Sequence, residues 1–306
     1  MKQIFCIGET VFDIIFRDNQ PVAARPGGSM LNTAVSLGRT GLKPVFISDL
    51  GLDAAGDLIL ASLESDGIDT RYVERFSDGQ TAISLAFLDE KRNASYSFYR
   101  NFPETRLLRP LPQAETGDIV LFGSFYSISP EVRNPLWDFL THAREHGAFL
   151  VYDPNFRTPY LKQLPNFRPW INENIAISQI TRGSAGDFMH IFEVSDAAGA
   201  YEQVIAHGGK TLIYTKSDAG VEVITPDIHL SIPVPEICPV STIGAGDAFN
   251  AGLIYSLAGR PAANPLPQSE PEWKSIILLA IDFSTDVCLH IDNYISPDFA
   301  ENLKHG

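Results

Sequence analysis

The sequence contains few cysteines, and they are widely scattered. Only three occur in 306 residues, Cys6, Cys238 and Cys288, and none forms a Cys-x-x-Cys pair or a Cys/His ligand spacing. This spacing argues against a disulfide framework and favours a reducing compartment. We expect all three to be small buried hydrophobic residues.

Long apolar runs are also absent. No segment reaches the roughly 18 apolar residues that a helix needs to span a bilayer, and the stretch 276–281 is bounded by Lys274 and Asp282. The short apolar run at the N-terminus stops at Glu9 and Asp13, which is typical of a strand and not of a signal peptide. The sequence therefore predicts a cytoplasmic protein with no membrane partner.

Basic residues are too few to balance the acidic ones. Lysine and arginine number 23 against 37 aspartates and glutamates, which gives a formal net charge of −14. A chain this acidic repels nucleic acid and anionic membranes, so we expect neither as a partner. An anionic small ligand would need local devices such as helix N-termini, exposed backbone N–H groups or a metal ion.

The apolar pattern alternates between short strands and helices along most of the chain. This alternation predicts an α/β fold of three layers, a mostly parallel sheet with helices on both faces. In the helix predicted at 54–65, Leu58, Ala61 and Leu63 are the candidates to face inward. We expect strands at 3–7, 44–48, 119–122, 148–152, 211–215 and 220–224, and helices at 29–38, 54–65, 130–146, 244–257 and 273–289.

A different pattern interrupts this alternation. Residues 81–88 place large apolar side chains on one face and small ones on the other, and 95–100 alternate in the same way. The segment between them, 89–93, is charged and turn-like. These features predict a β-hairpin with one face exposed or covered by a partner.

The strongest motif lies at 241–252, where Gly244, Ala245 and Gly246 open a helix and Asp247 follows in its first turn. Their small side chains let backbone N–H groups approach an anion at the positive end of the helix dipole. A carboxylate beside an anion site makes sense if it takes a proton from a nucleophile aimed at that anion. The alternative is a helix start capped by Thr242 or Asp247, and a dinucleotide fingerprint fits poorly so late in the chain.

Two further glycine blocks come earlier. Gly27 and Gly28 precede the helix that carries Asn32, which can both donate and accept hydrogen bonds to a polar ligand. A plain turn followed by a helix start explains this block equally well. In the block Gly51–Gly56, Asp53 is explained well as a helix N-cap.

Together these motifs resemble the ribokinase-like (PfkB) family of carbohydrate kinases, and most closely its fructokinase-like members. The resemblance extends from Ile4 to about Leu289. It rests on four motifs in the right order: an early aspartate after the first strand (Asp13), Gly-Gly-x3-Asn (27–32), Gly-x-Asp-x2-Gly (51–56) and Gly-Ala-Gly-Asp-x-Phe (244–249).

The resemblance implies an ATP- and Mg²⁺-dependent transfer of the γ-phosphate to a sugar hydroxyl, in one kinase domain over 1–306. Asp247 would be the catalytic base, and Gly244, Ala245 and Gly246 would form the anion hole. A β lid from about 11–26 and 80–101 would close over the sugar, and such lids often make a homodimer. The sugar would be bound by Asp13, Gly27, Gly28, Asn32, Arg100, Asn155 and Arg157, and the nucleotide by Thr215, Lys216, Gly220 and Thr242.

Some of these residues have plainer explanations. Arg157, in the family-like stretch Asp153–Arg157, would counter phosphate charge, but it also fits a surface arginine after a proline-containing turn. Arg100 at the end of a lid strand is explained almost as well by a surface charge. Lys216 would contact phosphate or remain solvated.

The chain departs from the family pattern at three places. Ser241 stands where an aspartate is common, which weakens the bracing of the anion hole. Ser184–Asp187 replaces Asn-x-x-Glu, so Asp187 would support Mg²⁺ indirectly on a shorter side chain. The nucleotide loop Thr215–Gly220 differs from the usual Thr-x-Gly-x-x-Gly.

Fructose is the first acceptor that we expect, and a monovalent cation such as K⁺ is a further expected cofactor. One alternative is a 2-keto-3-deoxygluconate or nucleoside kinase of the same fold, where Phe98, Phe102 or Met30 would line a base slot. The other is a sugar-binding sensor without catalysis, motivated by the changes at Ser241 and 184–187.

Overall fold

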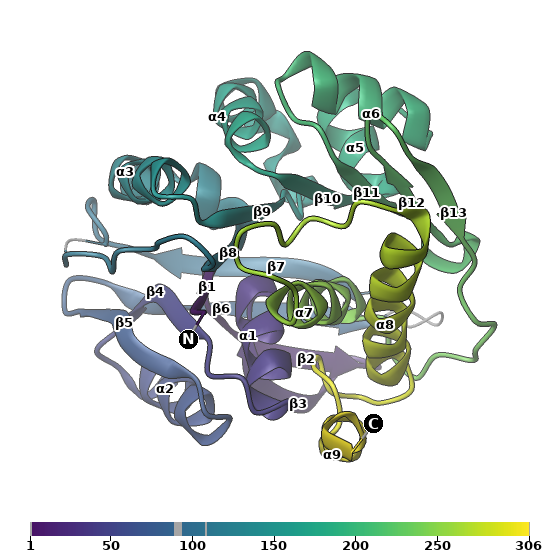
Figure 1. Ribbon diagram of the computed structural model, residues 1–306. Helices are drawn as coiled ribbons and strands as arrows, with labels where there is room; N and C mark the ends of the chain where they lie inside the picture. Colours follow the sequence, from purple (N-terminus) through teal and green to yellow (C-terminus); the bar gives the residue numbers. More distant parts are fainter. Residues whose placement is uncertain (1, 89–93, 108, 306) are drawn as a thin grey trace. The chain divides into compact units, whose positions relative to one another are not determined.

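The computed structural model describes residues 2–88, 94–107 and 109–305 (Figure 1). The chain forms two compact units, each built from three stretches of sequence. The first contains Met1–Ile4, Gln113–Glu236 and Leu253–Ile281, and the second contains Phe5–Pro112, Ile237–Gly252 and Asp282–Gly306. The single kinase domain over 1–306 stays a prediction.

The first unit has six strands in the order β8-β9-β10-β11-β12-β13. Strands β8 to β11 run parallel, and β12 and β13 are antiparallel additions. Helices cover both faces of these strands, with α3 to α6 on one side (Figure 1). The strands are β8 (Ile119–Gly123), β9 (Phe149–Asp153), β10 (Ile180–Ser184), β11 (Leu212–Thr215), β12 (Val221–Ile224) and β13 (His229–Ile232). The helices are α3 (Pro130–Glu145), α4 (Leu164–Ile177), α5 (Ala185–Phe192) and α6 (Ala197–Ala206).

The second unit holds the parallel strands β1 (Ile4–Ile7), β4 (Val45–Gly51) and β5 (Asp69–Phe76) in the order β1-β4-β5. Every residue of β4 is buried, as expected for a parallel strand covered on both faces. Its helices are α1 (Ser29–Arg39), α2 (Ala54–Ser65) and α9 (Pro297–His305). Helices α7 (Ala245–Ala258) and α8 (Glu270–Cys288) contribute residues to both units.

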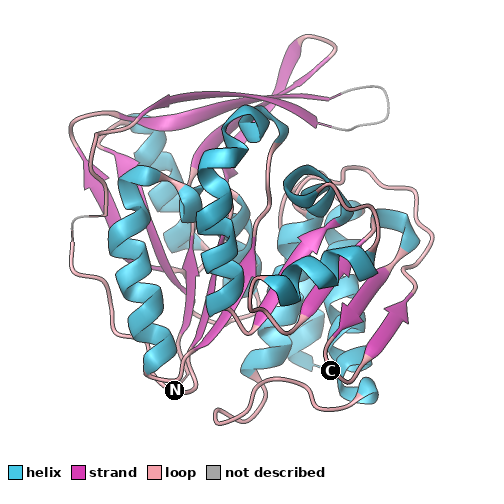
Figure 2. Ribbon diagram, turned by 90° about the horizontal axis from the view of Figure 1, so that it is seen from above, coloured by secondary structure: helices cyan, strands magenta, loops and turns pink. Residues whose placement is uncertain are grey.

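A separate four-stranded sheet in the second unit has the order β3-β2-β6-β7, its strands drawn in magenta in Figure 2. Its strands are β2 (Val11–Arg17), β3 (Gln20–Gly27), β6 (Gln80–Leu88) and β7 (Ala94–Asn101). On β6 the small residues Ala82, Ser84 and Ala86 are buried, whereas Ile83 and Leu85 on the other face are half-buried. The predicted strand pairing is confirmed, and the predicted charged turn at 89–93 lies outside the described residues.

Two local predictions are corrected by the structure, the inward face of α2 and the burial of all three cysteines. Helix α2 buries Gly56, Ile59 and Leu63, whereas Leu58 is 56% exposed and Ala61 is also exposed. Apolar residues occur on several sides of this helix, so their spacing alone did not fix the buried face. The prediction of three buried cysteines holds for Cys6, whose burial raises its thiol pKa to about 12. It is wrong for Cys238, which is exposed, and for Cys288, which is only half-buried.

Helix α9 follows the helix that the sequence indicated as the last, and only Ala300 in it is buried. No helix among the described residues is long and apolar enough to cross a membrane.

Candidate active site

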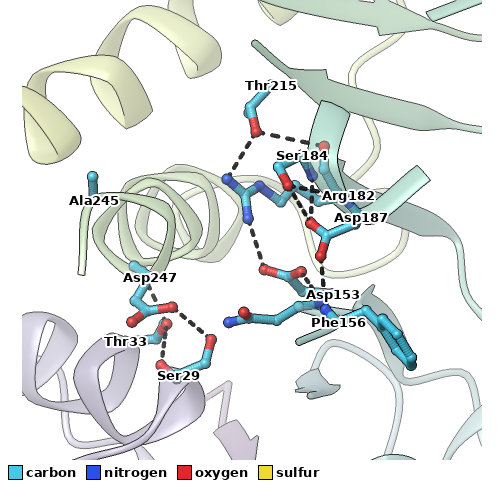
Figure 3. A network of polar contacts seen from close by, with 12 residues as sticks. Ser29, Thr33, Asp153, Phe156, Arg182, Ser184, Asp187, Thr215, Ala245 and Asp247 are labelled. Atoms are coloured by element: carbon cyan, nitrogen blue, oxygen red, sulfur yellow. Dashed lines mark hydrogen bonds and ion pairs between the residues drawn. The ribbon is translucent and has the colours of Figure 1, made fainter. Parts of the chain in front are cut away.

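Asp247 is held by the first turns of helix α1, in the second unit. Ser29 Oγ donates to Asp247 Oδ1 at 2.5 Å (Figure 3). Asn32 Nδ2 donates to Asp247 Oδ2 at 2.8 Å. Thr33 Oγ1 donates to the main-chain oxygen of Asp247 at 2.9 Å. This bond also joins α1 to the backbone of α7, the helix that carries Asp247. Asp247 is only 6% exposed, and its carboxylate is therefore fixed in direction before any ligand binds.

The loop before Asp247 depends on Gly244. This residue has φ of +83°, and a Cβ at its position would lie 2.2 Å from the main-chain oxygen of Asn293. Only glycine fits both the backbone angle and this close approach. The N–H of Ala245 donates to the Thr242 oxygen at 3.3 Å, so one of the three predicted anion donors is used in the loop's own turn.

Asp13 lies beside the glycine pair that precedes α1. It pairs with Arg25 across the β2–β3 ladder, two positions from the Val11–Gly27 pair. A Cβ at Gly27 would lie 1.9 Å from Asp13 Oδ2, and the Ser84 hydroxyl donates to Asp13 Oδ1. The glycine therefore leaves room for a buried carboxylate whose oxygens can accept hydrogen bonds from hydroxyl groups.

Gly28 brings the loop after β1 close to the start of α1. It has φ of +128°, and a Cβ there would lie 2.3 Å from the Glu9 oxygen. The Glu9 carboxylate in turn pairs with Arg100 Nη2 at 3.2 Å, and the Arg100 guanidinium lies 4.7 Å from the centre of the Phe98 ring. The structure thus brings Arg100 of strand β7 to the loop that packs against Gly28, and its side chain is an ion-pair partner more than a plain surface charge.

The turn at 51–56 links helix α2 to the small sheet. Asp53 is the N-cap of α2 and accepts from the Gly56 N–H at 2.8 Å, as predicted. The same carboxylate accepts from the Thr81 N–H and from Thr81 Oγ1, both at 2.7 Å. Burial by itself raises the Asp53 pKa, but the hydrogen bonds from Thr81 and Gly56 outweigh burial and hold the pKa below its ordinary value.

This arrangement predicts that Asp53→Ala lowers the free energy of unfolding by about 1–2 kcal/mol at pH 7, because a cap is lost. Since the folded-state pKa is lowered, the ionised carboxylate stabilises the fold above its unfolded-state pKa of roughly 4. The difference in the free energy of unfolding between the variant and the wild type should shrink as pH falls through the folded-state pKa.

Urea titrations at pH 7 and at pH 3 measure both effects. The matched control is Asp196→Ala, which removes the N-cap of α6 on Gly199 without a cross-link to a strand, and which should cost less; an equal cost would contradict the second role of Asp53.

A second polar group lies in the first unit, at the ends of β9, β10 and β11. Arg182 Nη1 pairs with Asp153 Oδ2 at 2.9 Å, and Nη2 donates to Thr215 Oγ1 at 3.0 Å (Figure 3). Arg182 and Asp153 are both buried. This arginine therefore fixes the starts of two loops to which the sequence assigned ligand-binding roles.

Asp187 makes structural contacts on both of its carboxylate oxygens. Oδ2 accepts from the Ser184 N–H at 2.7 Å in a reciprocal capping box, and Oδ1 accepts from the Phe156 N–H at 2.7 Å. These bonds fix the loop that carries Asn155, which has φ of +37°, and the exposed Arg157. No group of three or more potential metal-ligating side chains occurs among the residues that the structure describes, so the Mg²⁺ role of Asp187 stays a prediction.

The predicted nucleotide loop is a tight turn in the same unit. Lys216 N–H donates to the Gly220 oxygen at 2.9 Å, and Gly220 has φ of +98°. Lys216 Nζ pairs with Glu222 at 2.6 Å, so a carboxylate already offsets its charge, and its side chain is 28% exposed. Thr242, the other predicted nucleotide residue, is exposed in the second unit.

Sequence reasoning missed several residues that contact the predicted site residues. Ser29 follows the paired glycines directly, Thr33 follows Asn32, and Ser84 belongs to the small-residue face of β6, so each had a weak local signal. Arg182 had a stronger signal, since a charged residue inside an apolar strand calls for a partner. Only the fold shows which residue each one contacts.

Curated relatives of known function align over most of the chain. A model described as "pfkB family carbohydrate kinase" matches residues 1–266. A fructokinase of Rhizobium leguminosarum bv. trifolii is 26% identical over 261 residues, which cover 83% of this chain and 79% of that protein. A fructokinase of Vibrio alginolyticus is 22% identical over 277 residues (89% and 90%), and an aminoimidazole riboside kinase of Salmonella typhimurium is 24% identical over 260 residues (84% and 82%).

Solved structures are similar over nearly the whole chain. Aminoimidazole riboside kinase from Salmonella enterica, complexed with aminoimidazole riboside and an ATP analogue, has a TM-score of 0.85 at 20% identity and covers 99% of both chains. Fructokinase from Vibrio cholerae O395, with fructose, ADP and calcium ion, has a TM-score of 0.85 at 18% identity, covering 96% of this chain and 94% of that one. These likenesses confirm the predicted ribokinase-like α/β fold.

Proposed function

Because the chain belongs to the PfkB family of carbohydrate kinases, which transfer phosphate to sugar hydroxyls, we propose that it phosphorylates fructose with ATP and uses Asp247 as general base. The observation that carries this proposal is the fixed Asp247 carboxylate at the start of α7, directly after the Gly244 loop. A positioned carboxylate next to backbone N–H groups at a helix N-terminus is the combination that phosphoryl transfer requires.

In this mechanism the acceptor is bound through Asp13, Gly28 and Asn32. Its attacking hydroxyl donates to Asp247, which takes the proton as the new P–O bond forms and the bond to ADP breaks. The N–H groups of Gly244 and Gly246 stabilise charge on the transferring phosphoryl oxygens, since the N–H of Ala245 donates to the Thr242 oxygen. Thr215, Lys216, Gly220 and Thr242 are proposed to contact the nucleotide, and Asn155 and Arg157 to complete the acceptor set.

The charges around the proposed acceptor residues favour a neutral sugar. Arg100 is paired with Glu9, and the buried Arg106 is paired with Asp49 at 2.7 Å. In the second unit, Arg100 and Arg106 are thus each offset by a carboxylate, whereas Asp13 offers a buried acceptor for hydroxyl groups. A sugar acid such as 2-keto-3-deoxygluconate would meet more carboxylate than free positive charge here.

A nucleoside acceptor is less well supported, because the three apolar residues expected to line a slot for its base have other packing partners. Met30 is fully buried in α1 and belongs to the core, so it does not line a slot. Phe102 packs edge-on against Phe76 and lies under Arg106, and Phe98 stacks on Tyr96. The riboside kinases among the relatives nevertheless justify testing nucleosides beside sugars.

Mg²⁺ would be held mainly by the ATP phosphates and water, as is usual for this ion, since the described residues contain no cluster of metal-ligating side chains. When bound, it would neutralise charge between the β- and γ-phosphates. A monovalent cation beside the anion loop would fit Asn293, whose buried side-chain oxygen has no hydrogen-bond partner among the described residues. The cytoplasmic location stays a prediction from the sequence.

We also propose that the chain forms a homodimer through the four-stranded sheet. Its outer face carries Phe16 and Phe87, stacked at 5.0 Å, and Tyr99, which is 60% exposed. Pairing two such faces would bury these rings.

Light scattering should give twice the chain mass for the wild type and one chain mass for Phe87→Asp. The control Leu278→Asp, at an exposed leucine of α8, should stay dimeric; a monomeric wild type at micromolar concentration would contradict the proposal.

The function is tested by measuring ADP release from ATP and Mg²⁺ against a panel of sugars, keto-sugar acids and nucleosides. We expect fructose to give the highest kcat/KM. If no acceptor supports turnover while a sugar still raises the melting temperature, the chain is a sugar sensor and the kinase proposal fails.

A further inference from the structure

Ser29 occupies an unusual position for a residue to which the sequence assigned no function. It is the first residue of α1, immediately after the Gly27–Gly28 pair, so the helix start fixes its place. Its hydroxyl donates to Asp247 Oδ1 at 2.5 Å, and both residues are less than a tenth exposed. The proposed base therefore has a built-in alcohol as a hydrogen-bond partner.

The chemistry of that partner matches the chemistry of the acceptor. A serine hydroxyl and a sugar hydroxyl are both alcohols that donate one hydrogen bond and accept two. A general base works only on a proton within hydrogen-bond reach, so a sugar hydroxyl must also approach an Asp247 oxygen. Asn32 donates to Oδ2 at 2.8 Å and Ser29 to Oδ1 at 2.5 Å, so each Asp247 oxygen already accepts a hydrogen bond from α1, and the one on Oδ1 comes from an alcohol.

We propose that Ser29 is a positioning residue that holds Asp247 and withholds it from water until the sugar displaces the serine hydroxyl. The inference rests on the proposed role of Asp247 as base. The reaction to be suppressed is ATP hydrolysis, in which a water oxygen attacks the γ-phosphorus, the bond to ADP breaks and the water proton passes to Asp247. A wasteful hydrolysis of this kind competes with transfer whenever the acceptor site is empty.

The need to displace the Ser29 hydroxyl favours a sugar over water as the acceptor, because the sugar brings more binding energy. A sugar held by several hydrogen bonds can use that energy to replace one bond to Oδ1, whereas a single water cannot. The serine side chain has other staggered rotamers to which it can turn. Thr33 keeps α1 and α7 joined meanwhile through its bond to the Asp247 main-chain oxygen.

The test compares ADP formation without acceptor and with saturating acceptor, using the preferred compound of the panel. Ser29→Ala should raise the ratio of the acceptor-free rate to the acceptor-dependent rate about tenfold, the value of one hydrogen bond to a charged group. Ser29→Thr should keep the wild-type ratio, because it keeps the hydroxyl. Ser29→Cys, with a weak donor of similar shape, should behave like the alanine variant and serves if that variant folds poorly.

Thr33→Val is the matched structural control. It removes the bond to the Asp247 main chain without touching the carboxylate, so both rates should fall together and the ratio should stay unchanged. A Ser29→Ala ratio equal to that of the wild type, or a proportional loss of both rates, would overturn the inference while leaving the kinase intact. A wild type that phosphorylates no acceptor would instead overturn the proposed function, and this inference with it.

Discussion

Asp247→Asn is expected to lower kcat by about 10²- to 10⁴-fold, the usual effect of removing a positioned general base. An amide cannot take the proton of the attacking hydroxyl at neutral pH, whereas the other contacts to the acceptor remain. The dissociation constant for the sugar should therefore change little, because Asp13 and Gly28 are untouched. Single-turnover kinetics and sugar titrations by calorimetry separate the two effects.

The fold should tolerate this change. The Ser29 hydroxyl can still donate to the oxygen of the new amide. Asn32 can turn its own amide over, so that Oδ1, which is buried without a partner among the described residues, accepts from the new N–H₂. The matched control is Asp298→Asn on the exposed first turn of α9, which should leave kcat unchanged. Turnover of Asp247→Asn within a few fold of the wild type would remove Asp247 from its role.

Gly244→Ala is the second substitution with a large expected effect. The residue has φ of +83°, which costs a non-glycine residue about 1–3 kcal/mol, and the added Cβ would meet the Asn293 oxygen at 2.2 Å. The loop must therefore move away from Asn293, and its N–H groups with it. We expect a loss in kcat of about 10²-fold, as for loss of an anion-hole donor, and a lower free energy of unfolding.

The two causes can be separated with Gly67→Ala as the control. Gly67 has φ of +76°, but a Cβ there would meet no atom within 4 Å. This variant shares the backbone strain without the clash, so it should lose stability and keep its kcat. Urea titration and initial rates, both measured at a temperature where each variant is folded, give the comparison. If Gly244→Ala kept wild-type turnover, the loop would have no part in phosphoryl transfer.

The distribution of the site over the chain explains why much of it was predictable. The glycine blocks are local signals, because a positive φ or a close backbone approach at Gly28 and Gly244 requires glycine wherever the chain folds around it. The same holds for the N-cap Asp53 and for the start of α1. What these signals could not give is the partner of each polar side chain.

Those partners are distant in sequence. Ser29 and Asn32 meet Asp247 across 218 and 215 residues, and Arg106 meets Asp49 in a buried pair across 57. The prediction of the inward face of α2 was wrong for a related reason. Leu58 and Ile59 are both apolar, and only packing against the neighbouring strands decides which of them is buried. Hydrogen bonds and side-chain packing act over a few ångströms in space, so distance along the chain says nothing about them.

Local patterns in the sequence were enough to predict the α/β alternation, the starts of α1, α2 and α3 and the glycine-rich loops, because neighbouring residues set backbone conformation and apolar periodicity. The tertiary structure alone decided that the Asp247 carboxylate accepts from Ser29 and Asn32, and that Asp13 lies against Gly27. The physical reason is that a carboxylate's direction depends on which donors surround it, and the fold brings those donors from strands and helices far apart in the chain.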